Sequence, residues 1–256
     1  MKKLLDIGIK HFILRGLPRI FPKYIWGRIS PVLFTVFMHY AKTLRPLIFG
    51  TPSERFIEYS WAIKNLQEND KRILDVGCGD SLFDCKLAGL GYGYEIYAID
   101  LVSQCMNKKS NYHFLQADIV NAPFKDSSFD KIHALSTVEH IDEGKPGLSK
   151  DQITCMVNMC RILKRRGGLI LTMPLGDYDG ACNLHRFENL IRTAMENGLQ
   201  LDAQLYHIAQ GRKWEIISGD KDKAMEKIEL LLNKKKIIVC LSFTKNLGLF
   251  KEGDNQ

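Results

Sequence analysis

Residues 72–82 read RILDVGCGDSL, and they carry the clearest indication of the architecture of this chain. A short apolar run ends in an acid, and two glycines, Gly77 and Gly79, follow one residue apart. The run predicts a buried strand, and the glycines predict a turn whose backbone approaches a ligand more closely than side chains would allow. The GxGxxG fingerprint of dinucleotide sites would need a third glycine where Leu82 stands. A nicotinamide-linked oxidoreductase is therefore a distant alternative.

Working outward from this turn, apolar runs typical of strands alternate with amphipathic segments typical of helices. A helix is expected over 53–66, before the turn. Strands are expected at 72–76, 94–100, 112–118, 129–136, 167–174, 199–208 and 235–245, and helices at 81–90, 151–164, 186–198 and about 220–232. Such alternation predicts an α/β fold with a doubly wound sheet, whose ligands bind beyond the carboxyl ends of the strands.

Three acids close three successive strands of this pattern: Asp75, Asp100 and Asp118. A carboxylate at Asp100 can accept both hydroxyls of a ribose, and one at Asp118 is placed to meet an adenine amino group. Each acid alone could instead be a turn former, a helix cap or a loop residue. Beside a glycine turn, the three together favour a cationic amino-acid nucleoside over a polyphosphate.

The basic character of the chain belongs to its N-terminal end. Of the net charge of +7, residues 1–50 contribute nine basic side chains against one acid, Asp6, so that the remainder is close to neutral. We therefore expect no nucleic-acid partner. The seven cysteines are scattered and contain no CxxC pair. This argues against a disulfide framework or a structural zinc site and favours a cytoplasmic location.

The composition divides the chain into a basic helical arm (1–52), a main α/β domain (53–248) and a frayed tail (249–256). Within the arm, the uncharged stretch 29–41 has 13 residues, short of the roughly 20 needed to span a bilayer. Two interpretations of the arm stay open. It packs on the domain as a helical cap, or it lies on an anionic membrane surface and makes the protein peripheral at the inner membrane face.

The motifs ILDVGCG, YAIDL, FLQADIVNAPFKDSSFDKIHALSTVEHI and GGLILTMP resemble, in order and spacing, those of class I S-adenosylmethionine-dependent methyltransferases. The resemblance covers roughly residues 53–245. It implies a Rossmann-like, seven-stranded sheet whose last strand, at 235–245, is antiparallel, with S-adenosylmethionine as the cofactor.

The resemblance also implies which residues hold that cofactor. The glycine loop would hold the methionine end, the second strand end the ribose, and the third the adenine. Ser136 would face the methionine moiety or the acceptor. The implied residues are Asp75, Gly77, Cys78, Gly79, Asp100, Leu101, Asp118, Ile119 and Ser136.

Two further motifs, ERxxEYxWxxxNL from Glu54 to Leu66 and STxEHI from Ser136 to Ile141, resemble those of uncharacterised bacterial and archaeal members of the family. Such members often look associated with the modification of surface glycans or lipids. The acceptor is therefore expected to be a small molecule or a lipid-linked or glycan-linked group.

Methyl transfer to a hydroxyl needs a base that removes the hydroxyl proton. The catalytic candidates are His140, which we prefer, Glu139 and His185. Quinone O-methyltransferases carry an acid-x-x-Glu-His pattern that binds a divalent metal. Here Ser136 replaces the first acid, so that no metal site is expected. The expected reaction is O-methylation. The alternatives are C-methylation of a quinone-like lipid and a non-catalytic protein that binds the cofactor or docks on a membrane.

Overall fold

The computed structural model describes residues 53–79, 83–89, 93–102, 110–142, 147–177, 180–210, 213–217, 221–232 and 234–246. The expected arm at 1–52 and tail at 249–256 lie outside these residues. The helices are α5 (Arg55–Lys64), α6 (Phe83–Ala88), α7 (Lys150–Ile162), α8 (Leu184–Glu196) and α9 (Lys221–Leu231), with short 3-10 turns η2 (Ile119–Asn121) and η3 (Val138–His140). The strands are β1 (Arg72–Val76), β2 (Glu95–Asp100), β3 (Tyr112–Gln116), β4 (Phe129–Leu135), β5 (Leu163–Leu175), β6 (Leu199–Gln210), β7 (Lys213–Ile216) and β8 (Ile237–Lys245).

These strands form one mixed sheet in the order β3-β2-β1-β4-β5-β8-β6-β7. Strands β1 to β5 are parallel to one another, whereas β8 runs antiparallel to both β5 and β6. The doubly wound α/β fold and its antiparallel last strand are thus confirmed. The described sheet has eight strands rather than the expected seven. The additional strand is β7, a four-residue segment that forms a hairpin with the end of β6.

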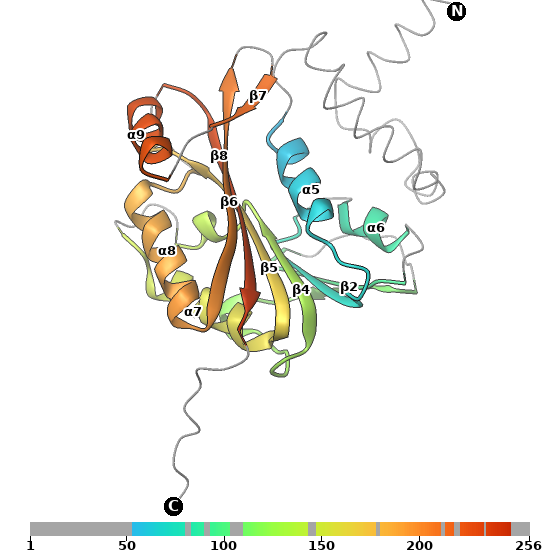
Figure 1. The fold of residues 1–256 in the computed structure, drawn as a ribbon. Helices are drawn as coiled ribbons and strands as arrows, with labels where there is room; N and C mark the ends of the chain where they lie inside the picture. Colours follow the sequence, from blue (N-terminus) through green and yellow to red (C-terminus); the bar gives the residue numbers. More distant parts are fainter. Residues whose placement is uncertain are drawn as a thin grey trace, which may run out of the picture.

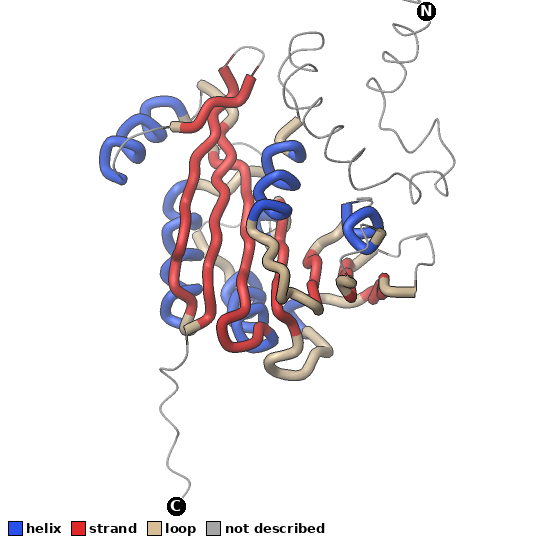
Figure 2. Tube along the Cα trace, turned by 45° about the vertical axis from the view of Figure 1, so that its right-hand side comes forward, coloured by secondary structure: helices blue, strands red, loops and turns tan. Residues whose placement is uncertain are grey.

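Helices cover both faces of the sheet. Figures 1 and 2 show α7 and α8 on one face and α5 and α6 on the other. Side chains alternate between the faces along each strand, as the pleat requires. On β8, for example, Val239, Leu241 and Phe243 belong to the cluster that includes α7 and α8, whereas Ile238 and Cys240 belong to the cluster beneath α5. The near-continuous apolar runs of the central strands follow from this double coverage.

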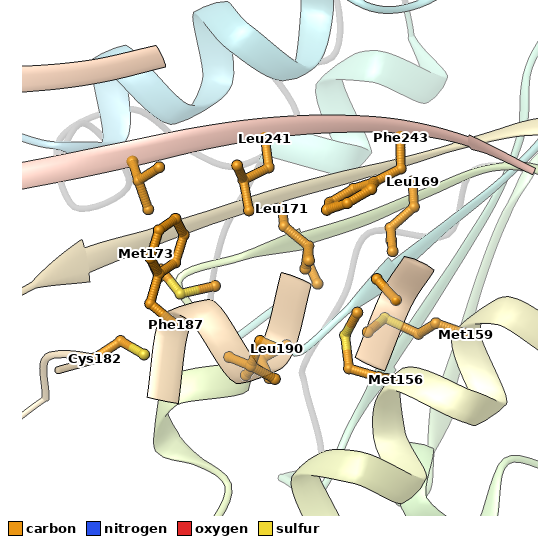
Figure 3. Packing of buried hydrophobic residues seen from close by; sticks show 14 of the residues in the cluster. Met156, Met159, Leu169, Leu171, Met173, Cys182, Phe187, Leu190, Leu241 and Phe243 are labelled. Atoms are coloured by element: carbon orange, nitrogen blue, oxygen red, sulfur yellow. The ribbon is translucent and has the colours of Figure 1, made fainter. Parts of the chain in front are cut away.

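The larger cluster lies between the sheet and helices α7 and α8. Figure 3 shows Met156 and Met159 from α7, and Phe187 and Leu190 from α8, facing the strand residues of β5 and β8. Helix α7 begins with a capping box in which Ser149 and Gln152 bond each other's backbone amides, which fixes where this helix starts.

Helix α5 precedes the first strand in the sequence but packs across the middle of the sheet. Its Trp61 is buried, and the indole Nε1 donates a hydrogen bond of 3.0 Å to the carbonyl oxygen of Leu241 on β8. Residues 180 positions apart in the chain are thereby joined. This contact fixes the height of α5 over the strand ends, where its first turn contributes to the site described below.

None of the described helices is both long enough and apolar enough to cross a bilayer.

Candidate functional site

A cavity of about 410 Å³ opens where four neighbouring strands end, and we call it the strand-tip cavity. Its walls come from the ends of β1, β2, β3 and β4 and from the first turn of α7. The lining residues are Val76, Gly77, Ile99, Asp100, Leu101, Ala117, Asp118, Ile119, Val120, Ser136, Thr137, His140, Ile141, Asp142 and Asp151. This is the edge at which ligands of open α/β sheets bind.

The turn after β1 requires glycine at position 77 for two reasons. Its φ is +70°, a conformation that side chains with a Cβ rarely adopt. A Cβ there would also lie 2.2 Å from Cγ2 of Thr137, whose Oγ1 donates to the carbonyl oxygen of Val76 at 3.0 Å. Gly79 also has a positive φ, of +53°, but a Cβ added to it would meet no described atom within 4 Å. The two glycines therefore differ in how tightly the fold constrains them.

Asp100 joins the glycine loop to the end of β2. Its Oδ2 accepts a hydrogen bond of 2.8 Å from the amide of Gly79, and its Oδ1 accepts one of 2.9 Å from the amide of Val102. A carboxylate has about four acceptor positions, so these two bonds leave capacity for ligand hydroxyls. Asp118 caps η2 in a similar way, because its Oδ1 accepts from the amide of Val120 at 2.9 Å.

Most of the residues expected to bind the cofactor meet in this cavity. Gly77, Asp100, Leu101, Asp118, Ile119 and Ser136 all line it. Leu101 is 67% exposed there and offers an apolar surface to a flat ring. The cavity volume of about 410 Å³ is within the range of small-molecule sites. With a carboxylate at the second strand end and an apolar wall beside it, the cavity fits the adenosine part of S-adenosylmethionine.

Three of the residues expected to bind the cofactor are not among the lining residues of this cavity: Asp75, Cys78 and Gly79. Asp75 is buried beneath the loop, where burial raises the pKa of its carboxyl to about 6, partly offset by a hydrogen bond with Asp84. Cys78 is buried, and burial raises the pKa of its thiol far above the ordinary value. Asp75 and Cys78 therefore lie in the interior rather than on the cavity surface, and Gly79 contributes its amide, which donates to Asp100.

A second cavity, of about 260 Å³, adjoins the first, and we call it the carboxylate cavity. The two cavities share Ser136 and His140. The lining residues of the carboxylate cavity are Glu54, Arg55, Ser136, Glu139, His140, Pro174, Gly180, Lys236 and Ile238. Because β8 is antiparallel to β5, its first residues lie at the edge where β5 ends. This explains how Lys236 and Ile238 reach the site.

Glu139 is the most unusual group in the carboxylate cavity. Its side chain is buried, with 1% of the residue exposed, and neither Oε1 nor Oε2 has a hydrogen-bond partner among the described residues. Burial raises the pKa of this carboxyl to about 8, and the nearby Glu58 acts in the same direction, while the backbone amide of Glu139, Arg55 and the hydroxyl of Ser136 oppose the shift in part. A buried polar group without a partner costs free energy, and such groups concentrate at functional sites.

Glu58 holds the wall between the two cavities. It is fully buried on α5, and its Oε1 accepts hydrogen bonds from the hydroxyl of Ser136 and, at 3.0 Å, from that of Thr172 on β5. Its Oε2 pairs with Nη1 of Arg55 at 3.1 Å, and the same Nη1 donates to the carbonyl oxygen of Leu135 at 3.0 Å. These bonds tie α5 to the ends of β4 and β5.

Ser136 is held in a strained conformation by this network. Its φ is +49°, in the left-handed region that favours glycine. Strain of this kind persists only where surrounding contacts enforce it, and it gathers at binding sites. Here the bond to Glu58 fixes a side chain that lines both cavities.

Arg55 and Glu58 belong to the motif ERxxEYxWxxxNL, but the sequence predicted no role for either of them, and it did not predict Lys236 at the site. The missed signal was a glutamate on the apolar stripe of α5, three positions before Trp61. A carboxylate on a buried helix face needs a specific partner.

The three catalytic candidates are not placed alike. His140 is exposed and lines both cavities, and Glu139 lines the carboxylate cavity. Both are carried by η3, which the buried side chain of Gln152 holds through a 2.9 Å bond to the carbonyl oxygen of Val138. His185 lies on the exposed side of α8, where its Nε2 contacts Nδ2 of Asn189 at 3.1 Å, and it lines neither cavity. Within the described ranges, no three His, Cys, Asp or Glu side chains converge as a metal site would require.

Comparison with known proteins shows what this chain is similar to. Residues 74–171 match the family described as "Methyltransferase domain". The chain is 29% identical over 150 residues to the O-methyltransferase rstn1 of Aspergillus nomiae, covering 53% of this chain and 62% of that one. It is 27% identical over 146 residues to the sterol 24-C-methyltransferase erg6 of Schizosaccharomyces pombe, covering 52% and 35%. The chain thus spans less than two thirds of the length of these curated relatives.

The fold also matches that of a solved structure. Phosphoethanolamine N-methyltransferase 2 of Haemonchus contortus, in complex with S-adenosyl-L-methionine, superposes with a TM-score of 0.53. The match covers 83% of this chain and 57% of that one at 13% identity. At this identity the likeness concerns the fold alone.

Proposed function

We propose that this protein is a class I S-adenosylmethionine-dependent methyltransferase that transfers a methyl group to a hydroxyl oxygen of a small-molecule or lipid-linked or glycan-linked acceptor. The match of residues 74–171 to a methyltransferase domain supports this proposal. The observation that carries the proposal is the pair of adjoining cavities. One fits a nucleoside, the other contains the buried carboxyl of Glu139, whose oxygens have no hydrogen-bond partner among the described residues, and Ser136 and His140 belong to both. The O-methyltransferase among the relatives supports oxygen as the methylated atom.

The residues of the strand-tip cavity would bind and orient the cofactor. Asp100 would accept the ribose hydroxyls while it holds the amide of Gly79, and Leu101 and Ile119 would flank the adenine. The cofactor supplies a methyl group on a sulfonium, which makes the methyl carbon electrophilic. What the protein adds is alignment of the acceptor oxygen, removal of its proton and exclusion of water.

The proton of the acceptor hydroxyl would pass to one of two side chains. His140 lines both cavities, and Glu139 lines the carboxylate cavity. His140 is our preferred base, since it lines both cavities and histidine is the commonest general base. His140→Ala is expected to retain binding of S-adenosylhomocysteine and to lose at least about a hundredfold in turnover. Unchanged turnover would remove His140 from the mechanism and leave Glu139 as the candidate.

The proposal is tested first by calorimetric titration with S-adenosylhomocysteine. The wild-type protein should bind it in preference to NAD, and Asp100→Ala should weaken binding at least about tenfold, because charge-assisted hydrogen bonds are lost. Asp202→Ala serves as the control, since Asp202 is an acid on β6 that lines neither cavity. Wild-type protein that prefers NAD, or binds neither compound, would contradict the proposal.

A second candidate is methylation at carbon, which the sterol 24-C-methyltransferase among the relatives brings into consideration. A lipid or quinone-like acceptor would need an apolar channel next to the cofactor. The carboxylate cavity instead contains Glu54, Arg55, Glu139 and Lys236 among its nine lining residues, which favours the oxygen reaction.

A further inference from the structure

We propose that the part of the acceptor bound in the carboxylate cavity is compact and polar, with the methylated hydroxyl at one end and an anionic group, a carboxylate or a phosphate, at the other. This inference rests on the proposed function and deepens it. It depends on how charge is distributed between the floor and the mouth of the cavity.

The floor of the cavity is formed by the buried Glu139, whose two carboxyl oxygens lack partners among the described residues. A group in that state is satisfied by a ligand that donates a hydrogen bond, or that accepts one when the carboxyl is protonated. A hydroxyl does both. An anion placed at this floor would instead lie where burial and the nearby Glu58 already keep a carboxyl from ionising, so that a negative charge is disfavoured there. The hydroxyl end of the acceptor therefore belongs at the floor.

The mouth of the cavity carries the cations. Arg55 and Lys236 are both exposed lining residues, and the remaining charged group there is Glu54. Arg55 is already paired with Glu58 through Nη1. Lys236 is therefore the cation that we assign to the anionic group of the acceptor. Exposed cations at the mouth of a pocket raise the local concentration of anionic ligands.

The size of the cavity limits what it holds. Its volume of about 260 Å³ is below the usual range for drug-sized ligands. It would accept a small hydroxylated acid or phosphate ester, or a lipid headgroup of the same chemistry, but not a ring system with a long apolar tail.

The test is to incubate the full-length protein with a whole-cell extract and methyl-labelled S-adenosylmethionine. The labelled products are then separated into aqueous and organic phases and passed over an anion exchanger. We expect the enzyme-dependent label to be retained on the exchanger. Retention from the aqueous phase identifies a free metabolite, and retention from the organic phase identifies an anionic headgroup.

Label in a neutral product overturns this inference while the proposed function stands. No labelled product from any fraction, although S-adenosylhomocysteine binds, contradicts the proposed function itself. Boiled protein provides the background.

Three consecutive lysines at 234–236 offer a matched pair of variants, because all three are exposed and only Lys236 lines the cavity. With the labelled acceptor, Lys236→Ala should raise KM roughly fivefold without changing kcat, since it removes binding rather than chemistry. Lys234→Ala should leave both unchanged. Added salt should raise the KM of the wild type more than that of Lys236→Ala. Equal kinetics of the two variants would overturn the assignment of Lys236.

Discussion

The strand-tip cavity and the carboxylate cavity lie side by side but are assembled in different ways. The first is lined mainly by short segments that directly follow strands β1 to β4. Two of its carboxylates bond amides two positions away, Asp100 with Val102 and Asp118 with Val120, and the bonds of Gly79 to Asp100 and of Thr137 to Val76 join neighbouring strand ends. The second brings together the first turn of α5, the turn after β4 and the start of β8. The proposed cofactor half therefore rests mainly on backbone groups at strand ends, and the proposed acceptor half on side-chain contacts between distant segments.

Removing the carboxylate that joins the halves should have the largest effect. Glu58→Ala leaves the hydroxyls of Ser136 and Thr172 without their acceptor and Arg55 without its ion-pair partner. We expect a loss of about 3 kcal/mol in the free energy of unfolding, measured by urea denaturation. Glu58→Gln keeps an acceptor oxygen and should lose about half as much. Equal stability of wild type and Glu58→Ala would show that the network does not hold the wall.

The glycine loop can be probed by two substitutions of the same chemistry. Gly77→Ala adds a Cβ at a positive φ and against Thr137, whereas Gly79→Ala adds one at a positive φ into open space. We expect Gly77→Ala to cost about 2–3 kcal/mol and to weaken binding of S-adenosylhomocysteine, and Gly79→Ala to cost about 1 kcal/mol. If the two variants unfold at the same urea concentration, steric contact with Thr137 is not what constrains the loop.

The carboxylate cavity should make stability depend on pH. An unfolded chain releases the proton of Glu139 near the ordinary value of 4.5, whereas the folded chain holds it up to about pH 8. Between these values the native state binds the more protons, so that its stability falls as pH rises. Relative to Glu139→Gln, the wild type should lose about 2 kcal/mol between pH 6 and pH 8. Arg55 and Glu58 are present in both proteins, and the difference between the two curves isolates Glu139. Parallel curves would contradict the burial of an unpaired carboxyl.

The anchor of α5 should have the smallest effect. Trp61→Phe keeps most of the buried ring but loses the hydrogen bond to the carbonyl oxygen of Leu241. We expect a loss of about 1 kcal/mol in the free energy of unfolding, with unchanged affinity for S-adenosylhomocysteine. A large loss of that affinity would mean that the position of α5 controls the cofactor half as well, and the separation of the two halves would not hold.

The same contrast explains what could be predicted from the sequence. The strand at 72–76 was predicted to the residue, and Asp100 and Asp118 were predicted at strand ends that line the strand-tip cavity, because strand ends and glycine turns leave local patterns. The hairpin strand β7 was missed, since Lys213–Ile216 is four residues long and alternates charged with apolar side chains. Such a segment is stable as a strand only because the extended end of β6 is available to pair with it.

The acceptor half was only partly predictable. Glu139 and His140 follow a strand and were therefore candidates. The partnership of Glu58 with Ser136 and Thr172 spans 78 and 114 positions in the chain, and no local spacing encodes it. The exposed Lys236 looks like its neighbours Lys234 and Lys235 until the direction of β8 places it at the site. His185 follows β5 in the sequence, but the turn of α8 directs it away from both cavities.

Because β8 runs antiparallel to β5, the segment that leads into β8 reaches the carboxylate cavity and can be engineered separately from the cofactor loops. Lys236, which lines the carboxylate cavity, belongs to the connection between α9 and β8. This connection contributes no residue to the strand-tip cavity. That connection can therefore be replaced, shortened or extended while the glycine loop, Asp100 and Asp118 stay unchanged. One scaffold for the cofactor can in this way be fitted with different acceptor specificities.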